Sequence, residues 1–429
     1  MKRIVVVLFF AFAAAGALFA QEVTLSGDLK TGFYIQQEKI GNDEPVALGG
    51  MTNNDGDSGA GQGRMRLDFH SAYGDMGLKA RFQIEPGSTA EGPFTPTWSF
   101  VYAYGNLFND QLTISAGLLG ESPWGTGGPR LRSEPETREY VSINALSGET
   151  YTATEGLVGI RFEYKPVFIP GLNIGFVLNQ PDKVVIATQK QEFADMLGES
   201  VIGAAYENDF FAVRVGYRFD SDADGYNKIN INEGSRLTYR LEERVLDKTA
   251  EGMRIWLNGE YYGMGSGKQE IQTMDGTGKI VKKKIGVGEY SVNWLYWLWD
   301  TDNFLAKCDV GLGIYKAYNN ENFRPFERQE YQNLEILPAF YYKIYDNLLQ
   351  TGLGLGFGME FGAGKTYKDS PYQYICIEPQ IRLNIASRGY VAAVYAFTDK
   401  YAWFDEADKA RRGEKSEKHS VNIRAVYMF

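Results

Sequence analysis

Apolar and polar residues alternate along most of the chain, in segments of about ten residues. The clearest segment is 349–361, LQTGLGLGFGMEF, in which mainly apolar side chains fill every second position and glycine or polar side chains lie between them. Successive side chains of a strand point to opposite faces of the sheet, so each segment has one apolar and one polar face. The pattern predicts β-strands from one end of the chain to the other.

Eighteen segments carry this alternation, which sets the expected number of strands. They are 23–35, 64–73, 76–85, 97–105, 110–118, 156–165, 172–179, 200–208, 210–219, 236–246, 252–262, 286–298, 303–315, 334–345, 348–361, 373–385, 389–397 and 419–429. Sixteen is the alternative count, because Glu243 interrupts the apolar face of 236–246 and because Pro338 and Pro379 each remove a hydrogen-bond donor from a strand.

The connections between these segments alternate in length. Short turns such as YGD (73–75) and YDNL (345–348) alternate with long polar segments such as 36–62 and 263–285. Short turns at one rim and long loops at the other are typical of transmembrane barrels, in which closure leaves no unpaired strand edge in lipid. We therefore expect an all-β fold, a transmembrane antiparallel up-and-down β-barrel of about 18 strands. A soluble sandwich or solenoid would share the period but not the alternation of connection lengths.

The amino terminus has the pattern of a secretory signal. Lys2 and Arg3 precede an apolar run over 4–20, and the first acidic residue is Glu22. We expect residues 1–20 to be cleaved and residues 21–429 to form a single barrel domain. The chain has 2 cysteines, too few for a disulfide framework. Its 54 acidic residues outnumber its 44 basic residues, which argues against nucleic acid as a partner.

The carboxyl-terminal segment VNIRAVYMF (421–429) alternates up to the last residue, with Val421, Ile423, Tyr427 and Phe429 on one face. A final strand of this kind that ends in phenylalanine resembles the assembly signal of bacterial outer-membrane β-barrel proteins. The resemblance implies a location in the cell outer membrane, with outer-membrane lipid and the barrel-assembly machinery as partners.

Three further segments resemble the general porins: VTLSGDLKTGFY (23–34), LTISAGLLG (112–120) before a long loop, and GIRFEYKPVFIPGLNIGFVLNQ (159–180) after it. The resemblance implies a homotrimeric porin through which small hydrophilic solutes and ions diffuse passively, without cofactor or enzymatic activity. Eighteen strands depart from the sixteen of general porins and match sugar-specific porins. A substrate-specific sugar porin therefore stays open as an alternative, and so does a non-conducting surface adhesin that binds through its long loops.

Charged residues on the polar faces are the candidate pore-lining residues, because a porin turns these faces toward its pore. The candidate cations are Lys30, Arg64, Arg66, Lys79, Arg81, Arg161, Arg214 and Arg218. The candidate carboxylates are Glu121, Glu134, Glu136 and Glu139. These glutamates lie in loop 119–155, which by the porin resemblance is a candidate constriction loop that folds inward to face the basic wall. Any barrel carries charges on its lumen face. The alternative that these charges have no role in selectivity therefore stays open.

The segment DSDADG (220–225) is a candidate metal site. Asp220, Asp222 and Asp224 match the alternating carboxylates in the first half of a calcium-binding loop, and Gly225 matches its turn. The twelfth position is Ile231 instead of the bidentate glutamate, which leaves two interpretations, a solvated acidic loop or a weakly bound calcium ion.

Aromatic residues fall into two groups by parity. The group expected in the interfacial belts is Trp98, Tyr102, Tyr104, Trp297 and Trp299. Trp294, Tyr296 and Tyr341 have the opposite parity and either form an aromatic track for sugars or fill the wall. Asp68 and His70 share a face, as the carboxylate and histidine of a barrel hydrolase would, but no strained nucleophile turn accompanies them.

We predict that the protein extracted from the outer membrane begins at Gln21, because the apolar run that ends at Ala20 has the pattern of a cleaved signal. Amino-terminal sequencing and the intact mass of the purified protein measure this directly. A mature chain that retains Met1 would contradict the prediction.

Overall fold

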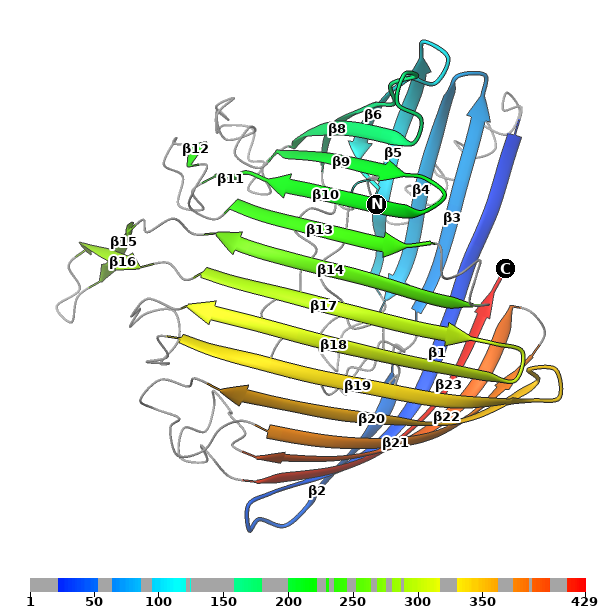
Figure 1. Cartoon of the computed structure of the whole chain (residues 1–429), viewed down its shortest axis with the longest axis vertical. Coiled ribbons are helices and arrows are strands. Elements are labelled where there is room, and N and C mark those ends of the chain that lie inside the picture. Colours follow the sequence, from blue (N-terminus) through cyan, green and yellow to red (C-terminus); the bar gives the residue numbers. More distant parts are fainter. Residues whose placement is uncertain are drawn as a thin grey trace.

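The computed structural model describes residues 22–52, 64–85, 95–120, 124, 158–179, 200–221, 229–230, 235–244, 252–263, 268–274, 280–286, 289–316, 330–361, 373–385, 388–401 and 415–429. In these ranges the regular elements are β-strands, and no helix in them is long and apolar enough to cross a membrane. Almost all of the strands belong to one large sheet (Figure 1).

Eighteen of the strands form the wall of the barrel. In chain order they are β1 (Glu22–Ile40), β3 (Arg64–Tyr73), β4 (Met76–Glu85), β5 (Thr95–Leu107), β6 (Leu112–Leu118), β7 (Val158–Tyr164), β8 (Leu172–Asn179), β9 (Val201–Glu207), β10 (Phe211–Arg218), β13 (Ser235–Glu243), β14 (Met253–Gly263), β17 (Glu289–Asp300), β18 (Phe304–Lys316), β19 (Glu330–Ile344), β20 (Leu349–Phe361), β21 (Gln373–Asn384), β22 (Gly389–Tyr401) and β23 (Ser416–Met428).

Each of these strands pairs antiparallel with the next one along the chain, and β23 returns to pair with β1. The closing ladder runs from the pair Asp28 and Met428 to the pair Ile40 and Ser416. The predicted antiparallel up-and-down barrel of about 18 strands is therefore confirmed, and the alternative count of sixteen is wrong. Segment 236–246, the weakest candidate, contributes β13, which pairs fully with β10 and β14.

The two prolines are accommodated because each interrupts a ladder on one side only. Pro338 lies opposite Cys308 in the β18–β19 ladder, while the β19–β20 ladder has a gap between Ile336 and Ala339. Pro379 pairs with Leu353 of β20, and the gap falls in the β21–β22 ladder. A proline lacks only the donor that would face one neighbour, so the strand continues.

The two faces of the wall differ as the alternation predicts. On β1, Phe33 and Ile35 are 45% and 53% exposed, whereas Tyr34 and Gln36 between them are 8% and 4% exposed. The closing strand repeats the pattern, with Ile423 exposed and Arg424 buried. A closed barrel with an apolar outer face satisfies its backbone in lipid, and this combination is the architecture of an outer-membrane protein. The predicted location in the outer membrane is confirmed on this ground.

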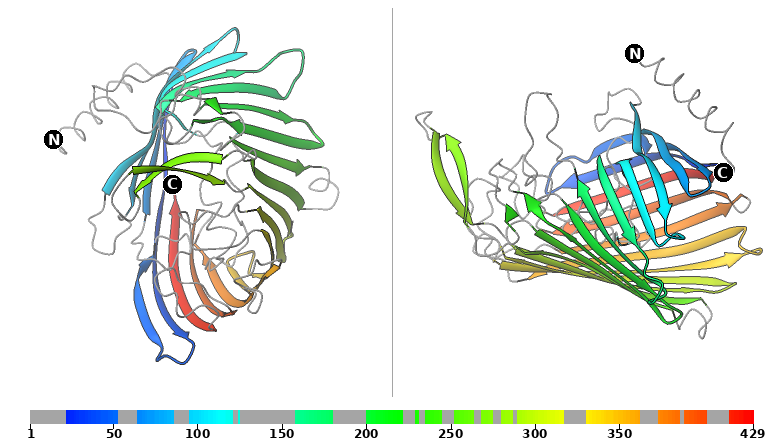
Figure 2. Two further views of the ribbon diagram at one scale, coloured as in Figure 1. Left: turned by 90° about the vertical axis from the view of Figure 1, so that its left-hand side faces the viewer. Right: turned by 90° about the horizontal axis from the view of Figure 1, so that it is seen from above.

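The wall is taller on one side than on the other. Strand β6 has 7 residues and β8 has 8, whereas β19 has 15 and β20 has 13. The tall strands lie side by side in Figure 1, and Figure 2 shows the strands arranged around the barrel axis from two further directions. The short turns lie at one rim and the long connections leave from the other, as predicted.

Some of the long polar segments contain further strands. Segment 36–62 includes the end of β1 and β2 (Val46–Thr52), which pairs with the second half of β1 while β3 pairs with its first half. Segment 263–285 includes the hairpin of β15 (Lys268–Met274) and β16 (Ile280–Gly286), which projects beyond the ends of β14 and β17 in Figure 1. The short strands β11 (Asp220–Ser221) and β12 (Ile229–Asn230) pair with each other.

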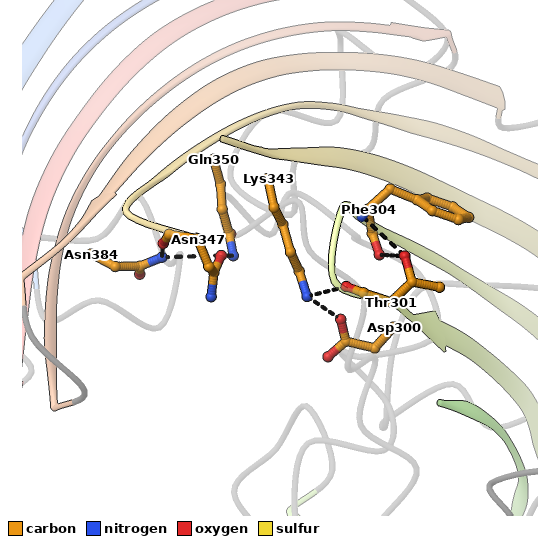
Figure 3. Close-up of polar contacts among 7 residues, drawn as sticks. All are labelled: Asp300, Thr301, Phe304, Lys343, Asn347, Gln350 and Asn384. Atoms are coloured by element: carbon orange, nitrogen blue, oxygen red, sulfur yellow. Dashed lines mark hydrogen bonds and ion pairs between the residues drawn. The ribbon is translucent and has the colours of Figure 1, made fainter. Parts of the chain in front are cut away.

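Side chains link neighbouring hairpins at the rim of short turns, as Figure 3 shows. Lys343 Nζ at the end of β19 donates to the Asp300 carboxylate and to the Thr301 carbonyl in the β17–β18 turn. Asn347 in the β19–β20 turn accepts hydrogen bonds from Gln350 Nε2 and from Asn384 Nδ2 at the end of β21. Asn347 itself has a positive φ, which asparagine tolerates because its short polar side chain bonds locally.

The last residue closes the barrel, which generates a prediction. Phe429 exchanges two backbone hydrogen bonds with Gly27 at 2.9 and 3.0 Å, and its ring lies where a Cβ at Gly27 would be. Deleting Phe429 removes these contacts at a cost of about 2–4 kcal/mol, and Gly27→Val displaces the Phe429 ring and also crowds the Arg66 carbonyl of β3. We expect a smaller folded fraction, measured as the heat-modifiable band on denaturing gels.

The matched control is Gly49→Ala on β2, where the added Cβ would make an ordinary contact of 3.4 Å. This variant should fold like the wild type. A normal folded fraction in both seam variants would show that the closing contact at Phe429 is dispensable.

Candidate functional site

The candidate functional site is the inner face of the barrel, which the alternation of the strands lines with polar and small side chains. Three parts of it are named by their residues. The basic wall is Arg66, Lys79 and Arg81 on β3 and β4. The loop seat is Tyr102, Leu119, Trp124, Val177 and Val201, which pack together as one buried cluster. The acidic wall is Asp309, Glu335 and Glu378 on β18, β19 and β21.

The basic wall is held in place by neighbouring strands. Arg81 Nε pairs with Asp68 Oδ1 across the β3–β4 ladder at 2.6 Å, and its guanidinium lies 5.0 Å from the centre of the Phe100 ring. Arg66 Nε donates to Gln83 Oε1 at 3.0 Å. Lys79 Nζ lies 5.5 Å from the centre of the Tyr104 ring. These groups are partly exposed, so their charges act on the lumen.

Other predicted cations occupy inward positions of the ladders. Lys30 of β1 lies opposite Arg64 of β3, next to the basic wall. Arg214 of β10 lies directly opposite Arg240 of β13. Arg218 lies at the end of β10, opposite Val201 of the loop seat. The backbone register therefore places all of them on the face that the sequence pattern predicted.

Arg240 is an inward cation that the sequence interpretation missed. Its Nη2 lies 3.2 Å from Glu242 Oε2, and its guanidinium lies 5.9 Å from the centre of the Trp256 ring. Glu243 interrupts the apolar face of segment 236–246, which weakens the parity signal there. Applied to that segment, the same parity would have placed Arg240 beside Arg214.

Asp68 and His70 share a face but have different partners. The Asp68 carboxylate binds Arg81, and His70 Nε2 lies 2.9 Å from the Tyr104 hydroxyl across two strands. The carboxylate is therefore engaged with a guanidinium, while the imidazole lies against a phenol. This arrangement differs from a hydrolytic pair, in which the carboxylate orients the histidine.

The chain turns into the barrel directly after β6. Leu119 and Trp124 are 0% exposed, although both belong to the connection after that strand. The Trp124 indole lies over Gly175 of β8 and Gly203 of β9, where a Cβ on either glycine would overlap with the ring. The described residues of the predicted constriction loop 119–155, which are Leu119, Gly120 and Trp124, thus lie against the inner wall.

Arg161 holds the same segment from the neighbouring strand β7. It is 4% exposed, its Nε lies 2.7 Å from Glu163 Oε1, and its Nη1 donates to the Gly120 carbonyl at 2.8 Å. Its guanidinium also lies 5.4 Å from the centre of the Tyr102 ring. Arg161 faces inward as predicted, but it is covered and paired instead of lining open space.

The acidic wall was also missed by the sequence interpretation. Asp309, Glu335 and Glu378 are at most 2% exposed on inward positions. Cys376 Sγ lies 3.2 Å from Glu378 Oε1. Strands β22, β23 and β1 separate β21 from β3, so this wall and the basic wall occupy different sectors of the barrel. The parity of the expected strands contains the signal, because Asp309, Glu335 and Glu378 fall on the polar faces of their segments.

Several aromatic predictions change in the structure. A bulge between Arg81 and Phe82 shifts the register of β4 against β5. Trp98 therefore packs against outward Phe82, with ring centroids 5.3 Å apart, while Tyr102 lies inside the loop seat. The expectation that Tyr102 and Tyr104 belong to an interfacial belt is wrong, because the bulge reverses the parity between Trp98 and these tyrosines.

The inward aromatics of the tall side fill the wall. Trp294, Tyr296 and Tyr341 are each less than a tenth exposed. Trp294 lies over Gly311 and Tyr341 lies over Gly352, in each case where a Cβ would be. Their faces are covered, so they do not form an exposed track for sugars.

The remaining candidate residues lie outside the described part of the chain. They are Glu121, Glu134, Glu136, Glu139, Asp222 and Asp224. Asp220 is described only as a residue of the short strand β11. Within the described ranges no group of three or more metal-ligating side chains comes together. The weak calcium site at 220–225 stays a prediction.

Comparison with known proteins gives matches to solved structures alone. No protein-family model matches the chain, and no curated protein matches it. A loop-deletion mutant of OmpT, an outer membrane protein of Vibrio cholerae, is 12% identical with a TM-score of 0.48, and the match covers 95% of this chain and 99% of that one. The outer membrane channel DcaP of Acinetobacter baumannii is 11% identical with a TM-score of 0.47, covering 95% and 97%. An anion-selective porin from Comamonas acidovorans is 13% identical with a TM-score of 0.43, covering 95% and 99%.

The basic wall generates a prediction about ion selectivity. A unit charge about 8 Å from a passing ion contributes about 0.5 kcal/mol in water, and salt screens part of this. Changing Arg66, Lys79 and Arg81 together to Gln should raise the ratio of cation to anion permeability roughly sevenfold, because the energies of the cation and of the anion change in opposite directions. The reversal potential of the folded protein in a planar bilayer under a salt gradient measures the ratio.

Asp68→Asn is the matched control, because it leaves the cations in place and removes the carboxylate that pairs with Arg81. Its reversal potential should move in the opposite direction. Equal reversal potentials in the wild type and the triple variant would show that the basic wall lies away from the ion path.

Proposed function

We propose that the protein is an outer-membrane porin, a channel through which small hydrophilic solutes and ions diffuse passively. One observation carries the proposal: the closed barrel turns an apolar face outward and a charged face inward, and the segment after β6 lies against that inner face. The apolar outer face by itself indicates only that the barrel lies in a membrane. A charged inner face, partly exposed at the basic wall, is what a water-filled path needs.

The charges of the lumen favour polar solutes over apolar ones. Arg66, Lys79 and Arg81 lie in one sector, and further inward cations continue around the wall through Arg214 and Arg240. Oriented charges of this kind replace part of the hydration of a polar solute, whereas an apolar solute gains nothing from them. The protein therefore needs no cofactor and no covalent step, and we propose that it is not an enzyme.

A sugar-specific porin is the weaker alternative. Sugar recognition commonly uses aromatic faces, and the inward rings of Trp294, Tyr296 and Tyr341 are covered.

Surface adhesion is the second candidate, and the β15–β16 hairpin favours it because the hairpin projects from the rim of long connections. The porin resemblance further suggests a homotrimer, which the mass of the detergent-extracted protein would test.

The first test is the conductance of the folded protein in a planar bilayer. We expect stepwise openings, because each inserted barrel adds one water-filled path. Folding is established beforehand by heat-modifiable mobility on denaturing gels, and heat-unfolded protein serves as the control.

Absence of steps from protein shown to be folded and inserted would refute the porin. In that case binding of whole cells to host surfaces, with and without residues 268–286, would test the adhesin. Uptake of sugars of increasing size into liposomes that contain the protein separates a general porin from a sugar-specific one, because a general porin discriminates by size and charge alone.

A further inference from the structure

We propose that Trp124 and Arg161 form a two-point clamp that holds the segment after β6 against the inner wall and thereby sets the width of the pore. The part of the proposal that concerns the pore rests on the proposed porin function. In this arrangement Arg161 is a positioning residue instead of a charge that acts on passing ions.

The first point of the clamp is a flat slot made by two glycines. Gly175 of β8 and Gly203 of β9 are directly opposite each other in the ladder. With no side chain at either position, the backbone forms a floor wide enough for an indole, and the Trp124 ring lies on it. Val177 and Val201, both fully buried, flank the ring in the same cluster. Such a slot accepts a large flat side chain only if the two residues beneath it stay glycine.

Packing holds the ring in this slot. The Trp124 side chain is 0% exposed. Among the described residues its Nε1 has no hydrogen-bond acceptor. An indole buried in this way is retained by its contact area, and removing a buried tryptophan generally costs several kcal/mol. The slot therefore determines the position of Trp124 by packing and not by a polar contact.

The second point of the clamp is the Arg161 guanidinium. Glu163 lies 2.7 Å from its Nε, while Nη1 donates to the Gly120 carbonyl at 2.8 Å. The guanidinium makes these contacts with two different nitrogens held in one rigid plane, whereas a lysine would have to reach both oxygens with a single nitrogen on a flexible chain. Glu163 is itself buried, so the pair adds little net charge to the lumen. The burial of both side chains separates them from the path of ions.

The two residues that the clamp holds are close together in sequence, and they are held through different atoms. Arg161 grips the backbone at Gly120, and the glycine slot grips the side chain at Trp124. A chain held at two points four residues apart has a fixed direction as well as a fixed position. Gly120 and Trp124 are therefore held at defined places inside the barrel, which is what a stable pore width requires.

The test compares four variants in the folded, full-length protein: Trp124→Ala, Gly203→Ala, Arg161→Lys and Arg161→Gln. The first two empty or block the slot. The third keeps the positive charge but loses the fork, and the fourth loses both. Gly311→Ala is the matched control, because Gly311 lies beneath the Trp294 ring in the same kind of contact on distant strands.

The primary readout is the rate at which trypsin cleaves after Arg130, Arg132 or Arg138, which follow Trp124 in the sequence. Release of a buried tryptophan should speed this cleavage at least about tenfold in Trp124→Ala. Gly203→Ala and both Arg161 variants should also speed it, and Gly311→Ala should leave it unchanged. Wild-type rates in Trp124→Ala and Arg161→Lys would overturn the clamp.

The second readout is the single-channel current. We expect larger and noisier openings in Trp124→Ala and in both Arg161 variants, with reversal potentials close to that of the wild type in Trp124→Ala and Arg161→Lys, which keep both charges of the Arg161–Glu163 pair. A shift of reversal potential in Arg161→Gln together with wild-type behaviour in Arg161→Lys would show that Arg161 acts through its charge, which overturns its positioning role.

The two readouts separate the clamp from the channel. Trypsin cleavage does not depend on conductance, so faster cleavage from variants of a protein that conducts no ions would keep the clamp and refute the pore. A conducting wild type whose variants are cleaved no faster would refute the clamp and keep the channel. Heat-modifiable mobility of every variant establishes that the barrel itself is folded.

Discussion

The structure depends on one constraint: in the hydrocarbon core of a membrane every backbone donor and acceptor must find a partner within the protein. An unpaired peptide group there costs several kcal/mol. Strand β1 meets this constraint for the whole barrel, because it pairs with β3 on one edge and with β23 on the other. The terminal pair of Gly27 and Phe429 completes that seam. Once the ring is closed, the outer face needs only apolar side chains, and the inner face is free to carry charge.

Glycine is the means by which this barrel fills its inner face. At several places an aromatic ring lies over a glycine, as Trp124 does over Gly203, Trp294 over Gly311 and Tyr341 over Gly352. A glycine in a strand leaves a shallow gap and a weakly protected backbone, and a neighbouring ring covers both. The rings of Trp294 and Tyr341 belong to the strand next to their glycine and thicken the wall. Trp124 comes from a connection, so the same contact there fastens a residue outside the strands to the wall.

Period-two alternation was enough to predict the architecture from the sequence, because lipid and lumen impose opposite demands on every strand. Even β13, interrupted by Glu243, takes its place, since a gap there would leave β10 and β14 without partners. The sites were less predictable because parity identifies a face but not a partner. Arg161 faces inward as expected, yet its burial against Glu163 and Gly120 depends on a segment distant in sequence. The bulge at Phe82 reverses the parity of Tyr102, and the alternation of apolar and polar residues does not predict such a shift.

The two cysteines lie on opposite sides of the finished wall. Cys308 is opposite Trp297 on the outer face, whereas Cys376 lies inside beside Glu378, with β19 and β20 between their strands. Three strand spacings amount to about 14 Å, well beyond the roughly 7 Å that a disulfide spans between Cα atoms. In an unfolded chain in the oxidising periplasm, this distance does not keep the two cysteines apart. A disulfide formed there would join two residues that the folded barrel holds apart. Such a bridge would act as a covalent trap, which makes thiol reduction a condition of assembly for any chain that has oxidised before insertion.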